Sequence, residues 1–181
     1  MENDGAEPAM ATRSPRDAAP RRRRIAIAAC SVVAIVVADQ LTKAWAVAAL
    51  SDGPISIIGN SVEFHLARNP GSAFGRFQGL TPLLALGAIV ASIFLARAVD
   101  RAQDPVIVTG LVLVLGGALG NFTDRIVRSP GVLHGYVIDF VRVGSFPVFN
   151  VADSCITIGA TILVVRSIFP PRSEQSADTA E

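Results

Sequence analysis

The chain has 181 residues, of which 51% are hydrophobic and 17% charged, and its formal net charge is +1. This apolar balance exceeds that of an ordinary soluble domain and indicates a membrane protein. A net charge so close to zero excludes a general electrostatic affinity for nucleic acid, so no nucleic-acid partner is expected.

The N-terminal segment, residues 1–24, is rich in alanine, proline and charge and ends in the basic cluster Arg21–Arg24. That composition predicts a disordered tail. An apolar run follows over 25–50, and a basic stretch before an apolar one is also the order found in a cleaved signal peptide. Asp39 and Lys43 interrupt the run and more apolar runs follow, which favours a retained first membrane span.

Three further apolar runs, 80–99, 105–122 and 151–169, approach the roughly 20 residues needed to cross a bilayer. The sequence therefore predicts an all-α membrane protein with four transmembrane helices in one domain, 25–169, followed by a disordered tail over 170–181. Lysine and arginine near the span ends place both termini of this multi-pass protein in the cytoplasm.

The first extracytoplasmic loop, 51–79, contains two local signals. Residues 61–69, "SVEFHLARN", alternate apolar and polar side chains as a surface strand does. Residues 69–75, "NPGSAFG", have the composition of a turn. We expect a small β-cradle on the extracytoplasmic face of the membrane.

Four acids that are far apart in the sequence, Asp39, Asp124, Asp139 and Asp153, are predicted to lie at one depth near that face. Ionisable residues in a membrane are candidates for function by default. Structural explanations also exist, since Asp39 and Lys43 can pair as i,i+4 neighbours, Asp124 can clamp a helix end, and Asp153 can be a helix N-terminal acid. Asp139 lies in an apolar stretch with no adjacent base, and is the hardest to explain in this way.

Two neighbouring carboxylates can hydrolyse a peptide bond without a metal or a nucleophile, one as general base toward water and the other as general acid. The helix dipole would help to keep Asp153 ionised, and the apolar setting of Asp139 favours its protonated form. Asp124 stays open as the alternative partner of Asp153. A catalytic triad would need His65 or His134, and neither lies near a nucleophile-elbow sequence.

Five motifs, taken together and in order, resemble those of the lipoprotein signal peptidases, also called signal peptidase II. They are "DQLTKAW" (39–45), "NPGSAFG" (69–75), "GGALGNFTDRI" (116–126), "VIDFV" (137–141) and "FNVADS" (149–154). The resemblance implies a bacterial inner-membrane aspartyl endopeptidase. Such an enzyme cuts the signal peptide from a prolipoprotein just before a cysteine that carries a diacylglyceryl thioether.

The resemblance also implies the site. The catalytic pair would be Asp139 and Asp153. The supporting and substrate-binding residues would be Asp39, Lys43, Asn69, Gly71, Asn121, Asp124, Arg125 and Asn150. No cofactor or metal is implied, the partners would be diacylglyceryl-prolipoprotein signal peptides and membrane lipid, and globomycin is the expected inhibitor.

Two other function classes are compatible with four membrane acids. A small proton-coupled transporter could use the same acids as a relay, although transporters often show internal repeats or broken helices, which this sequence lacks. A structural membrane adaptor without activity would leave Asp139 unexplained.

Overall fold

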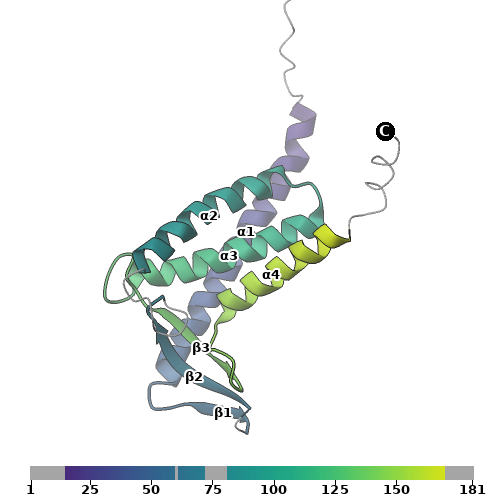
Figure 1. The fold of residues 1–181 in the computed structure, drawn as a ribbon. Helices are drawn as coiled ribbons and strands as arrows, with labels where there is room; N and C mark the ends of the chain where they lie inside the picture. The colour runs from purple at the N-terminus through teal and green to yellow at the C-terminus, as the bar shows by residue number, and fades with distance from the viewer. Residues whose placement is uncertain (1–14, 60, 72–80, 170–181) are drawn as a thin grey trace, which may run out of the picture.

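The computed structural model describes residues 15–59, 61–71 and 81–169. The predictions for 1–14, 72–75 and 170–181 lie outside the described residues. The elements in chain order are α1 (Pro15–Ala49), β1 (Ile55–Ile58), β2 (Val62–Asn69), α2 (Thr81–Arg101), α3 (Pro105–Val127), β3 (Val137–Val143) and α4 (Val151–Ile168). The sheet lies at one end of the helices, where α1 ends and α4 begins (Figure 1).

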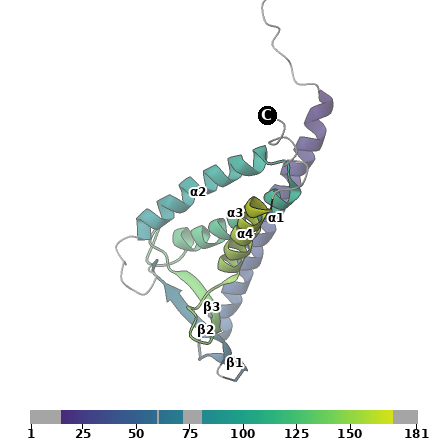
Figure 2. The same cartoon turned by 45° about the vertical axis from the view of Figure 1, so that its right-hand side comes forward.

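Three helices among the described residues are long and apolar enough to cross a membrane, namely α1 over Arg21–Ala49, α3 and α4. Helix α2, which coincides with the predicted run 80–99, is not one of them. The four-span prediction is therefore confirmed for three helices only. Helix α2 packs against α3 (Figure 2), and it exposes the large apolar side chains of Leu83 and Phe94.

The prediction of a disordered tail is wrong for residues 15–24, because α1 already begins at Pro15. A contact that is distant in sequence explains the difference. Arg21 forms an ion pair with Asp100 at the end of α2, and Arg24 Nη2 donates a hydrogen bond of 2.9 Å to the backbone oxygen of Asp100. The basic cluster is thus held against the end of α2 as part of a continuous helix.

The start of α3 is set by a capping side chain, and its length by the absence of glycine and proline in its last turns. Asp104 is its N-cap, with Oδ1 accepting the N–H of Val106 at 2.7 Å. The helix continues to Val127, past the predicted end at 122, because no glycine or proline follows Gly120 until Pro130. Asp124, which lies beyond the predicted run 105–122, therefore projects from the last turns of α3.

Glycines allow α3 to approach both α1 and α4 very closely. A Cβ atom at Gly116 would meet an α1 side chain at 2.8 Å, and one at Gly117 would lie 2.4 Å from the backbone oxygen of Ala152 in α4. A Cβ atom at Gly120 would lie 2.7 Å from Asp39 Oδ2. Only glycine leaves room at these contacts, which is how small residues bring membrane helices together.

The three strands form an antiparallel sheet in the order β1-β2-β3. Strand β2 confirms the strand predicted over 61–69. Strand β3 comes from the second loop and was not predicted. Its residues Val137 to Phe140 are all buried, and Asp139 is paired in register with Ala67 of β2.

An aromatic cluster joins the sheet to α1. The ring of Trp45 packs edge-on against Phe64 of β2 and Phe140 of β3, with centroid distances of 5.1 and 6.1 Å. Ala46 on α1 and Leu50, directly after it, are buried beside Phe140. This packing fixes β3, and with it Asp139, at the end of the helical bundle.

Candidate active site

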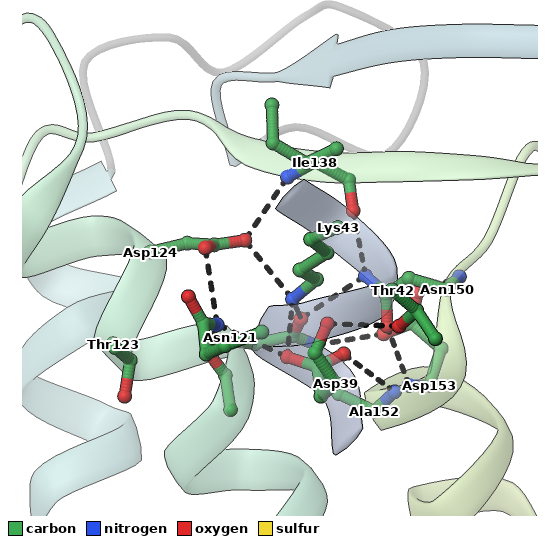
Figure 3. A network of polar contacts seen from close by, with 12 residues as sticks. Asp39, Thr42, Lys43, Asn121, Thr123, Asp124, Ile138, Asn150, Ala152 and Asp153 are labelled. Carbon is green, nitrogen blue, oxygen red and sulfur yellow. Dashed lines mark hydrogen bonds and ion pairs between the residues drawn. The ribbon is translucent and has the colours of Figure 1, made fainter. Parts of the chain in front are cut away.

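A buried lysine lies at the centre of a polar network (Figure 3). Lys43 Nζ is 2.8 Å from Asp39 Oδ2 and 2.9 Å from Asp124 Oδ2, and all three side chains are fully buried. It also donates a 2.9 Å hydrogen bond to Asn121 Oδ1. The predicted Asp39–Lys43 pair is confirmed, and all three donors of the ammonium group have acceptors.

Asp124 uses both of its carboxylate oxygens within the protein. Oδ1 accepts from Arg128 Nε at 2.7 Å and from Gln40 Nε2 at 3.2 Å. Oδ2 accepts from Lys43 and from the backbone N–H of Ile138 at 3.1 Å. Asp124 therefore clamps the end of α3, as predicted, and it also ties that end to α1 and to β3.

Asp39 performs a similar role toward α4. Its Oδ1 accepts the backbone N–H of Ala152 at 3.0 Å, in the first turn of α4, while its Oδ2 pairs with Lys43. Gln40 Nε2 donates to the backbone oxygen of Gly120 at 3.1 Å. Two neighbouring polar residues of α1, Asp39 and Gln40, thus position α4 and α3 respectively.

Asn150 and Asp153 form a capping box at the start of α4. Asn150 Oδ1 accepts the N–H of Asp153 at 2.9 Å, and Asp153 Oδ2 accepts the N–H of Asn150 at 3.2 Å. Asp153 Oδ1 accepts a further hydrogen bond of 2.7 Å from Asn121 Nδ2. The acid is thus oriented from two sides, at a helix N-terminus where a negative charge is favoured.

Two amide side chains hold Asp139. Asn150 Nδ2 donates to its Oδ1 at 2.7 Å and Asn69 Nδ2 to its Oδ2 at 3.1 Å. Asn69 is oriented in turn by the N–H of Gly71, at 2.9 Å, and Gly71 has a φ of +97°, which glycine adopts without strain. Asn69, Asn150 and Gly71 thus hold the Asp139 carboxylate in one orientation.

Burial of Asp139, which is only 3% exposed, is the main reason why its pKa rises to about 6. Repulsion from the Asp153 carboxylate raises the pKa further. The hydrogen bonds from Asn69 and Asn150 and the charge of Lys43 oppose this rise. The protonated form of Asp139 is therefore far more populated near neutral pH than that of an ordinary carboxyl group.

Two asparagines connect the Asp139 and Asp153 carboxylates. Asn150 donates to Asp139 and caps the helix of Asp153, while Asn121 donates to Asp153 and accepts from Asn150 Nδ2 at 3.1 Å. Asn121 also accepts from Lys43. The four predicted acids, which come from α1, α3, β3 and α4, therefore belong to a single network.

An apolar cavity of about 510 Å³ opens beside this network. Asp153, Phe149 and Ile158 are among the residues that line it. Arg125 lies in the field of the Asp139 and Asp153 charges, and its Nη1 atom is buried without a hydrogen-bond partner among the described residues. A ligand in this apolar cavity would thus contact Asp153. Arg125 Nη1 is a hydrogen-bond donor that no described residue uses.

Four members of the network were missed from the sequence, namely Gln40, Arg128 and the backbone N–H groups of Ile138 and Ala152. Arg128 had a signal, since it follows Asp124 by one helical turn. Within the described segments, no group of three or more His, Cys, Asp or Glu side chains could hold a metal ion. The ammonium group of Lys43 supplies the positive charge between the carboxylates of Asp39 and Asp124.

Comparison with known proteins gives consistent matches. The sequence model of the family described as Signal peptidase (SPase) II matches residues 31–169. The lipoprotein signal peptidase of Rhodococcus jostii (strain RHA1) is 46% identical over 155 residues, which cover 85% of this chain and 77% of the relative. That of Mycobacterium avium (strain 104) is 45% identical over 161 residues, which cover 86% of this chain and 85% of the relative.

Two solved structures are similar to the fold. Both are described as a bacterial membrane enzyme determined by the in meso method, one at 2.3 Å and one at 1.9 Å resolution. Each has a TM-score of 0.70 and 27% sequence identity. The matches cover 79% and 81% of this chain and 88% and 95% of the respective structures.

Proposed function

The chain belongs to the signal peptidase II family and is thus a membrane peptidase; from this premise we propose that it is an aspartyl endopeptidase that cleaves prolipoproteins. The observation that carries the proposal is the pair Asp139 and Asp153, linked through Asn150 and Asn121. The two carboxyl groups lie in different environments, and such a difference is what separates a general acid from a general base.

In the proposed reaction, the Asp153 carboxylate takes a proton from a water molecule as the water oxygen attacks the scissile carbonyl carbon. Asp139, in its protonated form, donates its proton to the carbonyl oxygen. Collapse of the tetrahedral intermediate breaks the C–N bond, and the leaving amine takes up the proton held by Asp153 while Asp139 recovers its own. The products are a new carboxyl terminus and a new amino terminus.

Asp124, the alternative partner for Asp153, fits this role poorly. Both of its oxygens are engaged by Lys43, Arg128, Gln40 and the Ile138 amide. Breaking those contacts to move a proton would leave Lys43 partly unpaired in the interior, which is costly. We assign Asp124 a positioning role.

The proposed substrate is a prolipoprotein whose cysteine, just after the cleaved bond, carries diacylglyceryl. The apolar cavity beside Asp153 suits the apolar part of such a substrate. Arg125 has an unused buried donor close to both acids and would bind a substrate backbone carbonyl. Globomycin is the proposed inhibitor, and no nucleic-acid partner is proposed.

The proposed topology has four membrane spans, with α2 as the fourth. Along α1, Arg24 and Asp39 are separated by about 22 Å at 1.5 Å per residue, against a hydrocarbon core of about 30 Å. If the basic cluster marks the cytoplasmic boundary, the carboxyl groups lie in the extracytoplasmic half. Both termini would then be cytoplasmic, and the extracytoplasmic sheet would lie over the site.

The proton-coupled transporter has no support from the comparisons, which all point to peptidases or to a membrane enzyme. The same four acids are explained by a structural ion-pair network and a catalytic pair, so no relay is needed.

The substrate proposal is tested with purified protein in detergent and two precursors that differ only in diacylglyceryl modification. We expect cleavage before the modified cysteine, inhibited by globomycin, and cleavage of the unmodified precursor slower by at least about tenfold, a difference of about 1.4 kcal/mol in transition-state binding. Equal rates for the two precursors would refute the lipid requirement, and no cleavage of either would refute the peptidase proposal.

A further inference from the structure

A second cavity lies far from the carboxyl pair, between the N-terminal half of α1 and the first half of α3. Its volume is about 720 Å³. Two arginines and a glutamine, Arg23, Arg24 and Gln103, lie on its lining toward the beginning of both helices. Below them the lining is apolar or small, with Ile27 and Val112 among its members.

The charged end of this cavity has unused positive charge. Arg24 donates a hydrogen bond from Nη2 to the backbone oxygen of Asp100. Its Nε atom is buried without a hydrogen-bond partner in the described part of the chain. Arg23 is exposed and has no ion pair among the residues that the structure describes. The nearby acids are already neutralised, because Asp100 pairs with Arg21 and Asp104 pairs with an arginine of α4, and neither acid lines the cavity.

The apolar part of the cavity spans most of the depth of one lipid leaflet. It extends along α1 from Ile27 to Ile35, which is about 12 Å at 1.5 Å per residue. Half of a hydrocarbon core is about 15 Å. One acyl chain, lying parallel to α1 and α3, would therefore run the length of the groove while its headgroup stays beside the arginines.

We propose that this cavity binds an anionic phospholipid of the leaflet at the N-terminal end of α1, with its phosphate on Arg23 and Arg24 and an acyl chain between α1 and α3. Arginine matches a phosphate through paired N–H donors. Basic pockets between membrane helices are a recognised way to hold such headgroups. The inference does not depend on the peptidase proposal, because no residue of the carboxyl network lines the cavity.

The test is a titration of the full chain, in neutral detergent, with phosphatidylglycerol or phosphatidylcholine of identical acyl chains, read by native mass spectrometry. We expect phosphatidylglycerol to bind at least tenfold more tightly than phosphatidylcholine. The change Arg23→Gln should weaken phosphatidylglycerol about fivefold, and Arg23→Gln with Arg24→Gln about 25-fold. Arg22→Gln is the matched control, since Arg22 is exposed on the same helix, does not line the cavity, and should leave affinity unchanged.

A second pair of variants tests the groove without altering charge. Ala34→Phe fills the groove and should weaken both lipids, whereas Ala29→Phe, on an exposed position outside the lining, should weaken neither. Soluble glycerol phosphate should not displace bound phosphatidylglycerol. Equal affinity for the two lipids, an Arg22→Gln effect as large as that of Arg23→Gln, or displacement by glycerol phosphate would each overturn the proposal.

Discussion

Replacing Lys43 by methionine removes the positive charge that two buried carboxylates share. At an effective dielectric constant of about 20, each contact, at 2.8 Å to Asp39 and 2.9 Å to Asp124, is worth about 6 kcal/mol in Coulomb energy. Desolvation of the three ions, at several kcal/mol each, opposes this gain. Because the variant keeps both carboxylates buried without the cation that they share, and only Asp124 retains another in Arg128, we expect a net loss of about 3–5 kcal/mol in the free energy of unfolding.

Thermal unfolding of the purified protein in detergent measures this loss, which corresponds to a fall of roughly 6–20 °C in Tm for a chain of this size. Arg142→Met is the matched control, because Arg142 makes an exposed ion pair with Glu63 that contributes at most about 1 kcal/mol. Adding Asp39→Asn and Asp124→Asn to Lys43→Met should recover part of the loss. An unchanged Tm for Lys43→Met, or a triple variant no more stable than the single one, would refute the reasoning.

Two further predictions concern the acids and their support. Since the pKa of Asp139 is raised to about 6, its proton is present below that pH and lost above it, so kcat/KM for prolipoprotein cleavage should fall about tenfold per pH unit above pH 6; a rate that rises from pH 6 to 8 contradicts the assignment. Gly117→Ala puts a Cβ atom 2.4 Å from the backbone oxygen of Ala152 and shifts the start of α4 with Asp153. This variant should lose about 1–3 kcal/mol in stability and also lose activity, while Gly87→Ala on α2, where nothing lies within 4 Å, should do neither.

Local patterns predicted the fold wherever the elements are determined locally. The apolar run at 151–169 became α4, and the alternation at 61–69 became β2. Strand β3 was not predicted, because "VIDF" is buried on both faces of the strand and so has no alternation of apolar and polar residues. The start of α1 was not predicted as a helix because it is held by the ion pair of Arg21 with Asp100, a residue far along the chain.

The contacts of the site were likewise predicted where they are local in sequence and missed where they join distant elements. The Asp39–Lys43 pair is one helical turn apart and was predicted from that spacing. The contacts of Asn121 with Asp153 and of Asn150 with Asp139 join different elements, and only the packed structure brings them together. The sequence left Asp124 and Asp139 as rivals for the same reason, since loops of any length can bring either one to α4.

The central claim is that Asp139 and Asp153 are the acids that act on the peptide bond, while Asp124 positions them. The most direct measurement is kcat for cleavage of diacylglyceryl-modified prolipoprotein by Asp139→Asn and Asp153→Asn, together with the Tm of each variant. We predict that each loses about 10²–10⁴ in kcat while remaining folded, and that Asp124→Asn loses Tm as well as activity. Cleavage by Asp139→Asn at the wild-type rate would contradict the account.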